Sequence, residues 1–163
     1  MKYPESVEKL IQCFEAFPGI GIKSAERMAI FMLSKMSKEE ALGFSKAIEE
    51  VVLDIKKCPK CGLFTDQDLC EVCSDDTRQK TIMIVENSKD VLAFEKVGIY
   101  KGQYHVLDGC ISPLNGVGPD DINLESLFLR INKDVITEII LALPSTISGE
   151  MTALYIKKML EKS

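Results

Sequence analysis

The sequence is short of the groups that most enzymes and all helical membrane proteins need. It has a single histidine, His105, placed within an apolar run that favours a packed structural role over that of a base. No Ser/His/Asp arrangement and no Gly-x-x-x-x-Gly-Lys-Ser/Thr phosphate loop is present. No apolar run reaches the roughly 20 residues of a membrane-spanning helix, and no secretory signal peptide is recognisable. We therefore expect a cytoplasmic protein without membrane contact and without a catalytic set.

A net positive charge is also lacking. The 163 residues carry a formal net charge of −5 at pH 7, and the sequence pI is about 5.0. The acidity is uneven, because residues 1–57 balance nine Lys/Arg against nine Asp/Glu, whereas the rest of the chain is acidic. Any contact with nucleic acid should therefore be local, and it should need several subunits to add up.

What the sequence does contain is a globular composition, 46% hydrophobic and 28% charged, and six cysteines. Four of them form two Cys-x-x-Cys pairs, Cys58/Cys61 and Cys70/Cys73, around a short polar loop. This spacing predicts one tetrahedral zinc and favours it over disulfides or a redox pair. A site with four cysteines has no open coordination position, so we expect it to be structural. The remaining two, Cys13 and Cys110, are expected to be buried thiols.

Residues 1–57 fit a pattern of three helices. Pro4 and Glu5 open the first, which ends near residues 17–22. The second is expected from about Lys23 to Met36, and Ser37 with Glu40 has the form of a capping box that starts the third. The residues of the second helix expected to face inward are Ala25, Met28, Ala29 and Met32.

The turn between the first two helices is the candidate nucleic-acid contact. Gly19 and Gly21 can take positive φ, and the start of the next helix exposes N–H groups at its positive dipole end. Lys23 and Arg27 lie four residues apart and share one face. A phosphate can bind there without base readout. The alternative is a tight corner between helices with two solvated basic residues, and the turn alone does not decide between them.

The C-terminal half alternates short apolar runs with helical patterns. Strands are expected at 81–85, 104–107 and 137–141, and helices at 90–97, 124–131 and 149–160, with Ser88 as a cap. Such alternation predicts a parallel sheet with right-handed crossovers. Glu86 and Glu150 each follow a strand, where they can hold Mg²⁺. Alternatively, Glu86 is a solvated strand-end residue and Glu150 favours a helix dipole.

Together these features resemble the RecR family of bacterial recombination mediators. The resemblance covers the whole length in order, and it is close at the segment YHVLDGCISPLNGVGPDDI (104–122) and at DVLAFE (90–95). It implies an α+β, multi-part fold. The parts would be a helix-hairpin-helix bundle at 1–57, a four-cysteine zinc finger at 58–80 and a Toprim-like parallel sheet at 81–163.

The resemblance also implies a function. RecR-like proteins are non-enzymatic, DNA-binding mediators of recombinational repair that act with RecO and RecF to help load RecA at single-strand gaps. They form homo-oligomers, as dimers or tetrameric rings. Lys23 and Arg27 would then face DNA. Glu86 and Glu150 would be Toprim carboxylates that meet partners or Mg²⁺.

Two departures from the family pattern stand out. The family's Thr-Asn-Pro-x-x-Glu-Gly-Glu stretch reads Leu143-Pro-Ser-Thr-Ile-Ser-Gly-Glu150 here, with Ser148 in place of the first acid. The chain also ends at Ser163, before the family's C-terminal segment, so we expect the Toprim part to be incomplete at its end. Two other interpretations are a Mg²⁺-dependent Toprim nuclease or primase-like enzyme, and a zinc-stabilised adaptor that contacts only protein.

Overall fold

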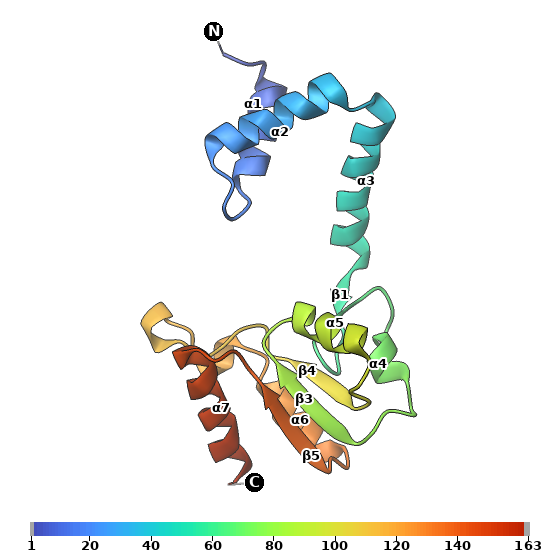
Figure 1. The fold of residues 1–163 in the computed structure, drawn as a ribbon, viewed down its shortest axis with the longest axis vertical. Helices are drawn as coiled ribbons and strands as arrows, with labels where there is room; N and C mark the ends of the chain where they lie inside the picture. The colour runs from blue at the N-terminus through green and yellow to red at the C-terminus, as the bar shows by residue number, and fades with distance from the viewer. Residues whose placement is uncertain (1, 162–163) are drawn as a thin grey trace. The chain divides into compact units, whose positions relative to one another are not determined.

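The computed structural model describes residues 2–161, which divide into two compact units, Met1–Asp54 and Ile55–Ser163. The first unit is helical, and the second combines a four-cysteine module with a parallel sheet flanked by helices (Figure 1). The predicted mixed fold is confirmed. The predicted domain boundaries at residues 57 and 80 stay a prediction.

The first unit is built on two crossing helices, α1 (Glu5–Glu15) and α2 (Ile22–Lys35) (Figure 1). Their shared core is small, because the fully buried residues of α2 are two alanines, with Met32 half-buried beside them. Its four buried residues are Ile11, Phe14, Ala25 and Ala29. The expectation that Met28 faces inward is wrong, since it is 40% exposed. Met28 lies one helical turn from Ala25, but the contact between α1 and α2 at Ala25 and Ala29 is narrow and does not reach it.

The third helix of this unit, α3 (Lys38–Asp54), begins as predicted and buries none of its residues. The Ser37 N–H donates to a Glu40 carboxylate oxygen at 2.7 Å, and the Glu40 N–H donates to the Ser37 hydroxyl at 3.1 Å. These reciprocal bonds form the capping box. The helix start is therefore determined locally, whereas the packing within residues 2–161 buries none of its apolar residues.

The four-cysteine module opens the second unit. A two-residue antiparallel ladder joins β1 (Lys56–Lys57) to β2 (Phe64–Thr65), and the short helix α4 (Glu71–Ser74) follows. The first cysteine pair lies in the loop between β1 and β2, and the second pair lies at the start of α4 and within it. This hairpin and helix bring the two pairs together.

The sheet has three parallel strands in the order β4-β3-β5. The central strand β3 (Thr81–Val85) has the bounds predicted from its apolar run. The outer strands β4 (Gln103–Val106) and β5 (Glu138–Ala142) are each displaced by one residue from the predicted bounds. In register, Ile84 of β3 lies between His105 of β4 and Leu141 of β5.

Helices cover both faces of this sheet, in keeping with its parallel topology. They are α5 (Ser88–Val97), α6 (Glu125–Lys133) and α7 (Ile147–Leu160), with 3-10 turns at η1 (Pro113–Asn115) and η2 (Pro119–Asp121). The residue that precedes α5 is Asn87, whose N–H donates to Asp90 at 2.9 Å, so Ser88 is its first residue and not the predicted cap.

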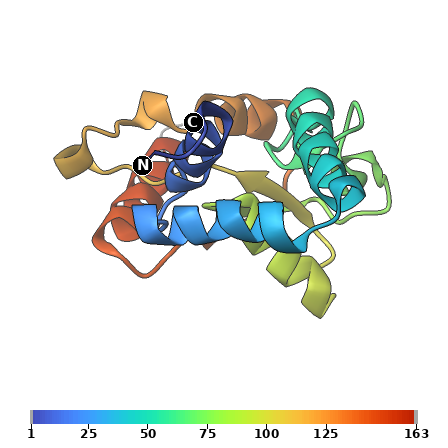
Figure 2. The ribbon, with the colours of Figure 1, turned by 90° about the horizontal axis from the view of Figure 1, so that it is seen from above.

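Alternate residues of the strands serve two separate cores. Met83 and Val85 point to the face shared with α5 and the cysteine module, where Val91 is fully buried. Ile82 and Ile84 point to the opposite face, against α6 and α7. Figure 2 shows α5 and α6 on opposite sides of β4. The cysteine module is thus part of one face of the sheet.

Candidate functional site: a four-cysteine centre, a helical hairpin and an acidic sheet edge

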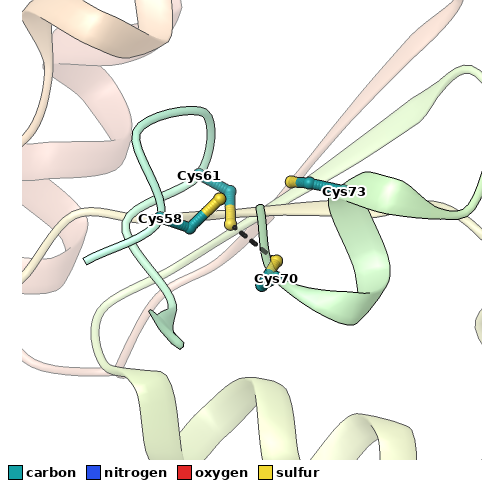
Figure 3. A group of neighbouring side chains, drawn as sticks. All are labelled: Cys58, Cys61, Cys70 and Cys73. Carbon is teal, nitrogen blue, oxygen red and sulfur yellow. Dashed lines mark hydrogen bonds between the residues drawn. The ribbon is translucent and has the colours of Figure 1, made fainter. Parts of the chain in front are cut away.

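The four predicted metal ligands meet in one cluster. Their sulfur atoms all lie within 4.8 Å of one another, and Cys61 Sγ is 3.5 Å from Cys70 Sγ (Figure 3). Cys58, Cys61 and Cys70 are buried, and Cys73 is half-buried. Sulfurs about 2.3 Å from a tetrahedral zinc are about 3.8 Å apart, so the cluster fits a structural zinc.

The protonation of these thiols shows why a cation suits the cluster. The hydrogen bond with Cys61 lowers the pKa of the Cys70 thiol, and the same bond raises the pKa of Cys61. A thiolate is therefore favoured at Cys70, while its neighbour Cys61 holds its proton more tightly. A divalent zinc can replace these protons and hold all four as thiolates.

Backbone geometry supports this centre. The Cys58 N–H donates to Leu63 O at 2.7 Å, and the Gly62 N–H donates to Cys58 O at 2.9 Å, which closes the loop around the first pair. The two other cysteines lie outside the cluster. The prediction that both are buried is wrong: Cys13 is exposed on α1, off its apolar stripe, and Cys110 is half-buried.

The hairpin between α1 and α2 has the turn that was predicted, with one difference. Gly19 has φ of 81°, in the left-handed region that favours glycine. Gly21 instead has φ of −89° and ψ of 167°, so the expectation of positive φ there does not hold. Gly21 is the N-cap of α2, a position that uses extended backbone. Its carbonyl accepts from the Ser24 and Ala25 N–H groups at 2.9 and 3.0 Å.

The basic residues after this turn are available to solvent. Lys23 and Arg27 are both exposed, and the first turn of α2 contains no acidic residue. An open space surrounds both glycines, since a Cβ at either one would meet no atom within 4 Å. The positive end of the α2 dipole and two cations thus lie beside an uncovered turn, an arrangement suited to a phosphate.

The carboxyl edge of the sheet gathers acidic residues. Glu86 directly follows β3 and lines a cavity of about 430 Å³. Ser148, which stands in place of an acid of the family pattern, lines the same cavity, whereas Glu150 lies exposed on α7 and is not among its lining residues. Among residues 2–161, the four cysteines are the only metal-type cluster of three or more His, Cys, Asp or Glu ligands.

Two further carboxylates line this cavity that sequence reasoning had not assigned, Asp108 and Asp121. Asp108 comes two residues after the last residue of β4, and Glu86 comes directly after β3. This similar position at the end of a strand could have identified Asp108 from the sequence. Asp121 comes from η2, and only folding of the 109–122 loop brings it near. Cys110 also lines this cavity, and burial together with the nearby Glu86 carboxylate raises the pKa of its thiol.

None of the helices in the described part of the chain is both long and apolar enough to cross a membrane.

Comparisons with known proteins agree with this arrangement part by part. Residues 7–52 match the RecR helix-hairpin-helix family, residues 55–75 match the RecR four-cysteine zinc finger domain, and residues 80–163 match the Toprim domain. Among curated proteins, the chain is 47% identical over 162 residues to a Recombination protein RecR of Streptococcus thermophilus. It is 45% identical over 163 residues to a Recombination protein RecR of Lactobacillus helveticus. Each alignment covers 99% of this chain and 81% of the relative. This chain therefore belongs to the RecR family.

Proposed function

We propose that this protein is a DNA-binding mediator of recombinational repair. It would act without catalysis, together with RecO-like and RecF-like proteins, to help a RecA-like recombinase displace single-strand-binding protein at gaps. The observation that carries the proposal is the open turn at Gly19, followed by the α2 N-terminus with Lys23 and Arg27 exposed beside it. The family name of the relatives supports the role in recombination.

The chemistry of this turn predicts contact with the DNA backbone and no sequence preference. Backbone N–H groups and two flexible cations bind phosphate oxygens, which are the same at every nucleotide. Because the protein as a whole is acidic, with a net charge of −5, a single copy should bind weakly. The affinity should fall as salt rises, because each phosphate contact releases counterions.

Fluorescence anisotropy with labelled single-stranded and double-stranded DNA tests this contact. The double variant Lys23→Ala/Arg27→Ala should bind more weakly at low salt, and its slope of log K against log salt should be reduced by about 1.4 to 1.8. The matched control is Lys9→Ala/Lys46→Ala, which removes the same charge from the same unit. Both control lysines are exposed and pair with glutamates one turn away on their own helices.

Unchanged binding and an unchanged salt slope in the hairpin variant would contradict the proposal. If that variant then still bound a RecO-like partner, the protein would be an adaptor that contacts only protein. Equal losses in the hairpin and control variants would mean that only bulk charge matters.

We further propose that the protein works as a homo-oligomer, as a dimer or a tetrameric ring, through its first unit. Helix α3 buries nothing, and several of its apolar side chains are more than half exposed, namely Leu42, Val51, Val52 and Leu53. On α2, Phe31 and Leu33 are similarly exposed. Apolar surface of this extent is seldom left in water, and a second copy offers the same self-complementary surface. Native mass spectrometry, with zinc quantified in the same sample, gives the stoichiometry.

The acidic edge leaves one alternative to test. Glu86, Asp108 and Asp121 share a cavity, and carboxylates are the ligands that Mg²⁺ takes in Toprim enzymes. A magnesium-dependent nuclease or primase-like enzyme would cleave or extend DNA, and Glu86→Gln would abolish that activity. Absence of either activity at high protein concentration with Mg²⁺ would support the mediator. A cytoplasmic location is part of the same proposal, since reducing conditions preserve zinc thiolates.

A further inference from the structure

The loop between the first two cysteines supplies a hydrogen bond to the parallel sheet. β4 is an outer strand, so one of its edges faces no other strand in residues 2–161. On β4 the Val106 N–H donates to the carbonyl of Cys61 at 2.7 Å. The Val106 carbonyl in turn accepts from the side chain of Asn123 at 2.9 Å. A residue of the proposed zinc centre therefore takes the place of a neighbouring strand at the last residue of β4.

The fit at this contact leaves no room for a side chain. Gly62 has φ of +80°, and a Cβ there would lie 2.9 Å from the Asn123 amide nitrogen and 3.0 Å from the Val106 carbonyl oxygen. Close approach of the two backbones requires glycine at this position. The cysteine loop and the end of β4 are thus in direct contact, and a shift of one displaces the other.

Two residues beyond this contact, Asp108 is held from two sides. Its N–H donates to the carbonyl of Glu86 at 2.9 Å, and its carboxylate pairs with the ammonium group of Lys57, the residue before Cys58. Asp108 has φ of 65° and is the one non-glycine residue with positive φ in the described chain. Aspartate adopts this conformation more readily than most residues, and here the contacts with Glu86 and Lys57 hold it in place.

We propose that zinc binding at the four cysteines sets the position of Asp108 beside Glu86, and so the shape of the acidic cavity at the sheet edge. Lys57, Cys61 and Gly62 are the positioning residues. Zinc ties the loop that carries them to α4. The other contacts that hold the loop are the two-residue ladder of β1 and β2, its own turn hydrogen bonds and the contact of Cys61 with Val106. Loss of zinc lets the Cys61 carbonyl leave Val106 and the ammonium group of Lys57 leave Asp108. This inference does not depend on DNA binding or on the oligomeric state.

Amide hydrogen exchange of the full chain, read residue by residue, tests the coupling. Removal of zinc with a chelator should speed exchange at Val106 and Asp108 by about tenfold or more, as expected when a hydrogen bond of ordinary strength is lost. Amides of α2, in the other unit, should not change. Restored zinc should restore protection. Faster exchange confined to the cysteine loop, with Val106 and Asp108 still protected, would overturn the proposal.

If zinc removal unfolds the whole second unit, two variants allow the same contacts to be tested with zinc still bound. Gly62→Ala and Lys57→Gln retain all four cysteines and should keep one zinc per chain. With zinc bound, Gly62→Ala should speed exchange at Val106 about tenfold. Lys57→Gln should speed exchange at Asp108 only about two- to fivefold, because this ion pair is half exposed.

The matched control is Lys56→Gln, which removes the neighbouring ammonium group, paired with the fully exposed Asp68 at 3.3 Å. It should leave exchange at both amides unchanged. If Gly62→Ala and Lys57→Gln both retain zinc and leave Val106 and Asp108 as protected as in the parent, the zinc centre does not position the acidic edge.

Discussion

The single histidine should make the folded protein measurably less stable in mild acid. His105 is fully buried on β4, where its Nε2 lies 2.8 Å from the Asn123 carbonyl oxygen and therefore carries the hydrogen. Its other ring nitrogen, Nδ1, has no hydrogen-bond partner within residues 2–161. Burial is the main cause that lowers the pKa of His105 to about 4, and the nearby Arg130 guanidinium lowers it further. The imidazole is consequently neutral in the folded protein.

The sign of the effect follows from proton binding. In the unfolded chain the imidazole has its ordinary pKa of 6.5, so below that pH the unfolded state takes up a proton that the folded state does not. Stability is therefore complete above pH 6.5 and is lost as the pH falls toward 4. The difference between the two pKa values amounts to about 3 kcal/mol in full, of which about 1 kcal/mol is lost between pH 7 and pH 5.5.

Two measurements check this prediction. Since the chain has one histidine, a proton NMR titration follows a single imidazole, which should show no midpoint between pH 5.5 and 7.5 while the protein stays folded. Denaturant unfolding at pH 7 and pH 5.5 should show the loss in the parent, and the free energy of unfolding of His105→Gln should change by about 1 kcal/mol less over this range. A midpoint at or above 6.5, or equal pH dependence in both proteins, would refute the reasoning.

Three further predictions concern stability. Arg78 donates to both carboxylate oxygens of Glu95, at 2.9 and 2.6 Å. Arg78→Gln should therefore lower the free energy of unfolding in urea by about 2 kcal/mol. A loss below about 0.5 kcal/mol, typical of surface ion pairs, would contradict this. Gly149→Ala would place a Cβ 2.0 Å from the Pro144 carbonyl oxygen and should cost about 2–3 kcal/mol. Gly43→Ala, which meets no atom within 4 Å, is its control and should be neutral or stabilising by up to about 1 kcal/mol; equal effects would count against the steric cause. Chelation of zinc should lower the Tm of the second unit and leave that of the first unchanged, and loss of both transitions together would oppose two independent units.

Features that depend on neighbouring residues could be predicted from the sequence. The capping box at Ser37 and Glu40 needs only a three-residue reach, and the start of α3 was predicted accordingly. The apolar run Thr81–Val85 predicted the buried central strand with its bounds. The spacing of the two Cys-x-x-Cys pairs predicted that four sulfurs can meet, because short loops restrict where each pair can lie. The edges of β4 and β5 were missed by one residue, since pairing with β3 decides them.

Other features were decided by the tertiary structure alone, because they join residues far apart in the chain. The ion pair of Lys57 with Asp108 spans 51 residues, and no local pattern announces it. The acidic cavity takes Glu86, Asp108 and Asp121 from three segments, while Glu150, which looked equivalent in sequence, lies exposed on α7. The sequence by itself thus determined the longer helices and the three parallel strands, and it indicated that four sulfurs can hold zinc. Only packing of the cysteine loop against β4 decided which carboxylates meet and what holds them in place.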